Sequence, residues 1–147
     1  MPRLYEVGGL VMGKKKDHSK ATDVARKIWR QVKHCEAKDK CHSKVAKPQL
    51  HGAHIYGVGA YPRLKVDLRN GMSLCATCHR YYTSAPLDFA EFVKTTKYKK
   101  YLKPLKDKNN GPKTKVFWPE KLAELQDILK QIEAGELTVD EARMYES

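Results

Sequence analysis

Residues 50–83 read LHGAHIYGVGAYPRLKVDLRNGMSLCATCHRYYT, and the order of residue types in this stretch organises the rest of the chain. A strand is expected at 50–56, where Gly57 and Gly59 then break the pattern. A second strand is expected at 64–68, because leucine and valine alternate there with charged residues. The Asn-Gly dipeptide at 70–71 is typical of a tight turn. A helix at about 74–83 completes a predicted ββα unit.

Polar side chains occur at fixed intervals within this unit. His51 and His54 lie in the first strand, Asn70 precedes the helix, and the helix carries Cys75-Ala76-Thr77-Cys78-His79. Phosphodiester hydrolysis needs a base for water, a cation for the charge that develops on the phosphate, and a group that orients the base. The order imidazole, amide, imidazole therefore indicates a DNA-cutting site with one catalytic metal.

In this order and spacing the segment from about Cys35 to Val93 resembles the His-Asn-His (HNH) endonuclease family, whose fold is a ββα-metal unit. The resemblance implies that His54 is the general base. It implies that Asn70 fixes the loop and keeps the base oriented. His79 would match the helix histidine that ligates the catalytic divalent cation.

The first metal ligand departs from the family pattern. Most members carry Asp or His directly before the base, but this chain has Ala53, and His51 is the natural substitute. His51 is about 6.6 Å from the usual position at roughly 3.3 Å per residue, so a bulge at Gly52 is expected. Phage recombination nucleases of the NinG type have a similar offset. Thr83 replaces a further histidine, which implies more water ligands and suits Mg²⁺ or Mn²⁺.

A second metal site is expected at the cysteines. Two residues separate the second pair, a spacing that lets both sulfurs bind one tetrahedral zinc ion, whereas five residues separate the first pair, which must loop out. His34 or His42 could replace one thiol, and four free cysteines without metal are the alternative. The candidate ligands of this structural zinc are Cys35, Cys41, Cys75 and Cys78.

The charge of the chain points to a nucleic-acid partner. Among 147 residues, 29 Lys and Arg outnumber 17 Asp and Glu, which gives a formal net charge of +12. Such an excess is typical of proteins that bind phosphates, here DNA. Solvent-facing charge is the alternative reading for the two arginines of the 56–69 loop. The candidate DNA contacts are Arg63, Arg69, Arg80, Lys97 and Lys100.

Membrane association is not expected, because no apolar run approaches the roughly 20 residues that cross a bilayer. A cytoplasmic protein is expected, in the host cell if the gene is carried by a phage. The fold class is α+β, with a nuclease core flanked by helices. The expected segments are an N-terminal arm and helix (1–34), the HNH core with its zinc knuckle (35–96), and a basic linker with C-terminal helices (97–147).

Three flanking helices are expected. The 19–33 segment repeats apolar residues every four positions. Pro119 is expected at the start of a second helix, Gly135 past its end, and Thr138 with Glu141 as a capping box for a short terminal helix.

Three functions are compatible with these features. The first is a metal-dependent DNA endonuclease with His54 as the base. The second is a junction-resolving recombination nuclease, for which paired symmetric cuts would require a homodimer. The third is a zinc-stabilised DNA-binding module without catalysis, which Ala53 and Thr83 favour.

Overall fold

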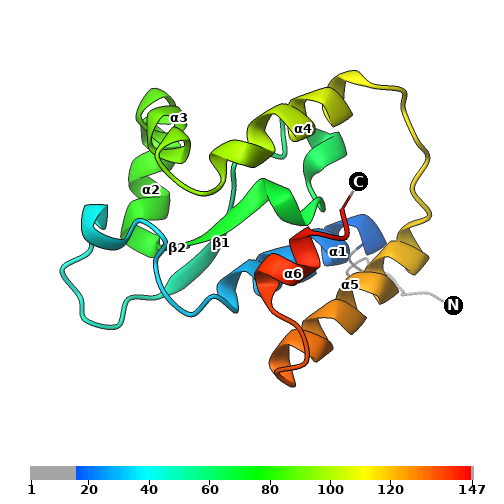
Figure 1. The fold of residues 1–147 in the computed structure, drawn as a ribbon, viewed down its shortest axis with the longest axis horizontal. Helices are drawn as coiled ribbons and strands as arrows, with labels where there is room; N and C mark the ends of the chain where they lie inside the picture. The colour runs from blue at the N-terminus through cyan, green and yellow to red at the C-terminus, as the bar shows by residue number, and fades with distance from the viewer. Residues whose placement is uncertain (1–15, 147) are drawn as a thin grey trace, which may run out of the picture.

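The computed structural model describes residues 16–146 and confirms the α+β class. A two-stranded antiparallel sheet of β1 (Leu50–His54) and β2 (Gly71–Cys75) lies at its centre, and α2 (Ala76–Ser84) follows β2 directly (Figure 1). The chain therefore has the order strand, strand, helix. The expected N-terminal arm falls largely within 1–15, outside the described residues.

The second strand lies later in the chain than the sequence predicted. Residues 64–68 span the end of η2 (Pro62–Leu64), a turn at 65–66 and the start of η3 (Leu68–Asn70), where η2 and η3 are short 3-10 helices. Val66 and Leu68 alternate with charged residues because the two apolar side chains pack into the core that α1 forms. They are not in a strand. Gly71 has an extended φ of −163° and pairs with His54, so the expected tight turn at 70–71 is also wrong.

The two strands pair in continuous register from Leu50 opposite Cys75 to His54 opposite Gly71, so the expected bulge at Gly52 is wrong. Glycine is required there for another reason. Helix α1 (Asp17–Arg30) crosses this face of the sheet, and a Cβ on Gly52 would lie 2.5 Å from the carbonyl oxygen of Arg26. At Gly71 a Cβ would lie 2.2 Å from the Trp29 ring. Two glycines thus let α1 rest directly on the strands.

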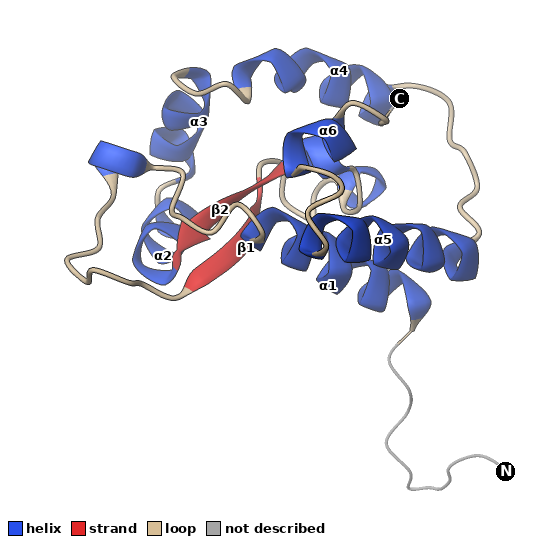
Figure 2. Cartoon of the chain, turned by 60° about the horizontal axis from the view of Figure 1, so that its bottom comes forward, coloured by secondary structure: helices blue, strands red, loops and turns tan. Residues whose placement is uncertain are grey.

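The remaining helices surround this unit (Figure 2). They are η1 (Lys38–Lys40), α3 (Pro86–Lys94), α4 (Lys99–Asn110), α5 (Trp118–Glu133) and α6 (Val139–Arg143). Helix α4 corrects the expectation of a linker, since it forms twelve residues of helix with Pro104 inside it. Gly135 follows α5 with a φ of +77°, and the capping box of Thr138 and Glu141 is present, so both predicted signals are confirmed.

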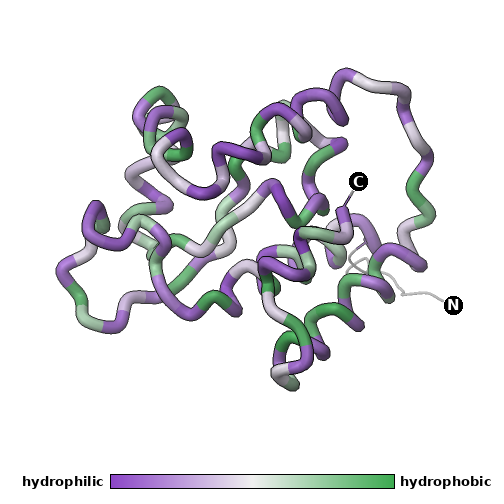
Figure 3. The backbone as a smooth tube through the Cα atoms, in the orientation of Figure 1, coloured by the Kyte–Doolittle hydropathy of each residue, from purple (hydrophilic) through white to green (hydrophobic). Residues whose placement is uncertain are grey.

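Buried side chains form two clusters. One joins α1 to α5 and α6, with Val66 and Leu68 between them. The other joins the strands to the cysteines, α2, α3 and Tyr98. In Figure 3 hydrophobic and hydrophilic residues alternate along α5, as expected of a helix with one face on a core. Because α1 belongs to the first cluster and also covers the sheet, it links the two buried clusters.

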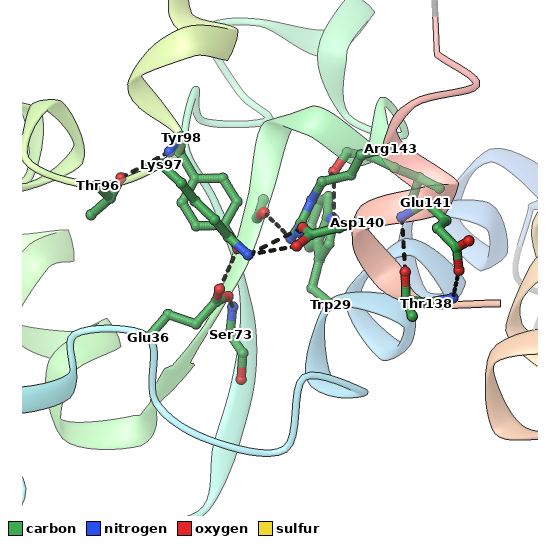
Figure 4. Close-up of polar contacts among 12 residues, drawn as sticks. Trp29, Glu36, Ser73, Thr96, Lys97, Tyr98, Thr138, Asp140, Glu141 and Arg143 are labelled. Carbon is green, nitrogen blue, oxygen red and sulfur yellow. Dashed lines mark hydrogen bonds and ion pairs between the residues drawn. The ribbon is translucent and has the colours of Figure 1, made fainter. Parts of the chain in front are cut away.

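A buried polar network fastens the C-terminal helix to the sheet (Figure 4). Arg143 is 1% exposed, and it donates hydrogen bonds to carbonyl oxygens of η3 and β2. Its guanidinium lies 4.7 Å from the centre of the Tyr98 ring. The Tyr98 hydroxyl donates to Glu36, whose other oxygen accepts from the backbone N–H of Ser73 at 2.7 Å. The network therefore fixes β2 relative to the segment that carries the first cysteines.

Candidate metal sites and active site

The four cysteines meet at one point. All four Sγ atoms lie within 4.8 Å of one another, and that of Cys41 is 3.6 Å from Cys75 and 3.7 Å from Cys78. Four sulfurs around a tetrahedral zinc at about 2.3 Å are separated by roughly 3.8 Å. The thiol set therefore fits a zinc ion. The first pair reaches the site because the intervening residues loop out through η1.

Backbone N–H groups point at these sulfurs, as they do around structural metal sites. Cys78 accepts from the N–H of His42 at 3.1 Å, and Cys41 accepts from Ser43 at 3.4 Å. Burial raises the pKa of Cys75, but hydrogen bonds from the Cys78 N–H and the neighbouring thiols outweigh it and lower that pKa. The ring of His42 instead stacks on Tyr81 at 4.1 Å. His42 therefore does not replace a cysteine, and the cluster consists of the four thiols.

A pair of histidines lies beside the cysteine cluster. His51 is in β1 and His79 is in the first turn of α2, directly after Cys78. Their Nδ1 atoms are 2.9 Å apart and the rings are nearly perpendicular, at 85°. Adjacent ligands of an octahedral ion at 2.0–2.1 Å are separated by about 2.9 Å. The two imidazoles are therefore placed where one divalent cation could join them.

The positions that depart from the family pattern offer no further ligand. Ala53 is 2% exposed and packs in the core of the sheet. The hydroxyl of Thr83 donates to the carbonyl oxygen of His79 at 2.7 Å. The pair of His51 and His79 would consequently leave the other coordination positions of an ion to water or substrate.

The imidazole of His54 is held by a single hydrogen bond. Its Nε2 lies 2.9 Å from the carbonyl oxygen of Lys65. A carbonyl can only accept, so Nε2 carries the proton and the lone pair is on Nδ1. Within residues 16–146 Nδ1 has no hydrogen-bond partner. The ring also meets Trp29 edge to face, with 4.9 Å between centroids. The Lys65 carbonyl and the Trp29 ring therefore both fix the orientation of the His54 ring.

The surroundings keep His54 neutral. Burial lowers the pKa of His54 to about 4, although the hydrogen bond to Lys65 opposes this change. The charges of Arg26 and His79 contribute to this lowering of the pKa, but less than burial does. The pKa of His79 is lowered by burial first, and then by the charges of His51 and Arg26. Arg26 thus lies within electrostatic reach of both histidines, and His54 can accept a proton at neutral pH.

Asn70 organises the loop that supports His54. Its side chain is fully buried; Oδ1 accepts from the Tyr56 N–H at 2.7 Å, and Nδ2 donates to the carbonyl oxygens of Tyr56 and Leu64 at 3.0 Å each. The next residue after Leu64 is Lys65, whose carbonyl binds His54. Asn70 therefore acts on the imidazole through the loop and makes no direct contact that fixes the ring.

Two of the arginines expected to contact DNA instead bind other groups of the protein. Arg63 donates to the carbonyl oxygens of Asn109, Gly111 and Pro112. Arg69 pairs with the fully buried Asp67 at 2.8 Å. The Arg63 guanidinium therefore holds the 56–69 loop against the end of α4 and the segment after it, whereas the ion pair of Arg69 lies within the loop.

The other three expected DNA contacts lie at the surface. Lys97 pairs with Asp140 at 2.9 Å, and Lys100 lies 5.2 Å from the centre of the Tyr101 ring. Arg80 follows His79 in α2 and is exposed. Of the three, Arg80 is the cation next to the histidine pair in the chain.

Sequence reasoning missed three residues of this site: Arg26, Trp29 and Lys65. Arg26 and Trp29 come from α1, and the predicted helix gave no sign that it crosses the strands. Lys65 contributes a backbone carbonyl, which has no signature in the sequence. The glycines at the two contact points are the signal that could have placed α1 there.

No described helix is both long and apolar enough to span a bilayer. No protein-family model, curated protein or solved structure matches this chain.

Proposed function

We propose that this protein is a metal-dependent DNA endonuclease in which His54 is the general base and His51 and His79 hold a divalent cation. The observation that carries the proposal is the 2.9 Å separation of the two ring nitrogens, together with the neutral imidazole of His54, which lies within electrostatic range of His79 and whose Nδ1 has no hydrogen-bond partner among residues 16–146. The net charge of +12 supports a polyanionic substrate.

A divalent cation bound by the pair would stabilise the charge that develops on the phosphate. His54 Nδ1 accepts a proton from the attacking water, and the water oxygen forms a bond to phosphorus as the bond to a sugar oxygen breaks. That sugar oxygen takes a proton from solvent. The Lys65 carbonyl accepts a hydrogen bond from His54 Nε2–H throughout, so it stabilises the imidazolium that forms.

Arg26 is the arginine that best fits a phosphate contact. Its side chain is 40% exposed and is bonded to Asp23 at 3.3 Å, an exposed pair that a phosphate can displace at little cost. Its backbone packs on Gly52, between His51 and Ala53 in the strand. Arginine forks bind phosphate oxygens in pairs, so Arg26 would orient the scissile group.

The cysteine cluster has a different role in this proposal. Its four thiols would complete the tetrahedral shell of a zinc ion and would leave no position for substrate. It would fix the start of α2, and with it His79, relative to the segment that carries Cys35 and Cys41.

Nicking of supercoiled plasmid in Mg²⁺ or Mn²⁺ tests the proposal. We expect His54→Ala to slow nicking by about 10²- to 10⁴-fold, the usual contribution of a general base, with Mn²⁺ affinity retained. His34→Ala is the matched control, because His34 is exposed and outside the histidine cluster. Equal nicking by wild type and His54→Ala would refute the assignment.

A zinc-stabilised DNA-binding module without catalysis is the second candidate. Ala53 is buried in the core and Thr83 is bonded to the His79 carbonyl, so among residues 16–146 the histidine pair offers two protein ligands for a catalytic ion. DNA binding without strand scission in either metal would favour this candidate.

A further inference from the structure

A cavity lies between the 56–64 loop and the end of α4. Its volume is about 280 Å³, and a neighbouring hollow of about 480 Å³ shares two of its lining residues. The smaller volume is close to the lower end of small-molecule sites, about 300 Å³, which suits a single planar base. We call this cavity the tyrosine pocket; it is lined by Tyr56, Tyr61, Leu64, Lys106, Asn109 and Asn110.

Two aromatic rings form one side of the tyrosine pocket. The centroids of Tyr56 and Tyr61 are 5.0 Å apart and the rings are inclined by 58°. The Tyr56 hydroxyl donates to the carbonyl oxygen of Leu102 in α4 at 3.4 Å, which holds that ring against the helix. Aromatic faces of this kind stack with nucleobases of any sequence.

The other side of the tyrosine pocket is polar. Asn109 and Asn110 each offer an amide donor and acceptor, and within residues 16–146 neither side chain is hydrogen-bonded to the protein. Lys106 is exposed and has no carboxylate partner in the same described range. Stacking rings, amides that can bond a base edge, and an ammonium for a phosphate together match one nucleotide.

The tyrosine pocket and the proposed base share one loop. Tyr56 is two residues after His54, and Asn70 bonds the backbone of both Tyr56 and Leu64. The carbonyl that holds His54 belongs to Lys65, the residue after Leu64. The same loop therefore positions both the tyrosine pocket and the imidazole of His54.

We propose that the tyrosine pocket binds one unstacked nucleobase of the DNA strand and so makes the protein prefer substrates with unpaired nucleotides over continuous duplex. This rests on the proposed function for the position of the cut, but the pocket itself binds without cleavage. Removing a base from a duplex has a free-energy cost that an unpaired nucleotide does not incur. Flaps and bulges meet this condition.

Binding of fluorescent single-stranded DNA, and of the same sequence as a duplex, tests the proposal. The zinc-loaded protein is used without Mg²⁺ or Mn²⁺, so that no strand is cut. We expect Tyr61→Ala to weaken single-strand binding by about 5- to 150-fold, the usual effect of one stacking contact, and to leave duplex binding within error. Tyr61→Phe, which keeps the ring, should bind as wild type does.

Tyr145→Ala is the matched control, because Tyr145 is 79% exposed and lies outside the pocket. Asn110→Ala is the second variant if Tyr61→Ala unfolds, and it should also weaken only the single-strand complex. Unchanged single-strand binding in the folded variants, or an equal loss of affinity for single-stranded and duplex DNA, would overturn the proposal that the pocket binds a base. A selective loss by Tyr61→Ala in a protein that never nicks plasmid would keep the pocket and reject the endonuclease.

Discussion

The Nδ1 atoms of His51 and His79 lie 2.9 Å apart although 28 positions separate the residues in the chain. The contact depends on strand register, because His51 pairs with Leu74 and α2 begins two residues after Leu74. A slip of one residue would turn His51 to the opposite face of the sheet, against α1. Whatever fixes the register of β1 therefore also assembles the histidine pair.

The close contact of α1 with β1 predicts the effect of a single methyl group. Gly52→Ala would place a Cβ 2.5 Å from the Arg26 carbonyl oxygen, so the helix must move away from the strand. We expect the free energy of unfolding to fall by about 3 kcal/mol, measured by urea titration. Gly59→Ala is the control, since no atom lies within 4 Å of its added Cβ. Equal stability of the two variants would contradict the packing.

The thiol cluster predicts that folding depends on zinc. Metal binding contributes about 10–16 kcal/mol in small zinc domains, which is comparable with a whole protein's stability of about 5–15 kcal/mol. We expect Cys78→Ser to lose zinc and its cooperative thermal transition, and a chelator to have the same effect on wild type. Ser43→Ala should retain both, because only the backbone N–H of Ser43 contacts a cysteine. A metal-free protein with an unchanged Tm would contradict this account.

The three buried hydrogen bonds of Asn70 predict a coupled loss of stability and activity. Asn70→Ala leaves the N–H and the carbonyl of Tyr56 without partners, at about 1–3 kcal/mol for each group, whereas the Leu64 carbonyl still accepts from the Asp67 N–H. We expect the unfolding free energy to fall by at least about 2 kcal/mol, and we expect nicking to slow because the Lys65 carbonyl is no longer fixed. Zinc content should not change. Full activity in this variant would show that the loop does not position His54.

The lowered pKa of His54 predicts a specific pH dependence of stability. The folded protein holds this pKa at about 4 against an ordinary 6.5, so it favours the neutral ring. The contribution is fully present above pH 6.5 and is lost as pH falls toward 4. We expect His54→Gln to lose less stability than wild type across this window, in urea titrations without Mg²⁺ or Mn²⁺. Other shifted groups, such as Glu146, are common to both proteins and cancel in the difference.

Local signals in the sequence predicted the elements that local chemistry determines. The capping box at Thr138, the glycine after α5 and the apolar face of α1 depend on residues within one or two turns. The cysteines were also predictable, because their spacing is itself the chemical requirement.

The features that the sequence predicted wrongly depend on contacts between residues far apart in the chain. All five residues of β2 are buried, so this strand lacks the alternation that marks a half-buried one. Helix α4 contains Pro104 and has Leu105 as its buried residue, a weak local signal for a helix. The internal bonds of Arg63 reach carbonyl groups at least 46 residues away, which no local pattern encodes.

The central claim is that His51 and His79 bind the same divalent cation. Pulsed electron paramagnetic resonance of the zinc-loaded protein with added Mn²⁺ detects directly bound histidine nitrogens. We predict two coupled imidazole nitrogens in wild type, one in His51→Ala and one in His79→Ala, with His34→Ala identical to wild type. A spectrum without imidazole coupling, or one that neither substitution changes, would contradict the claim.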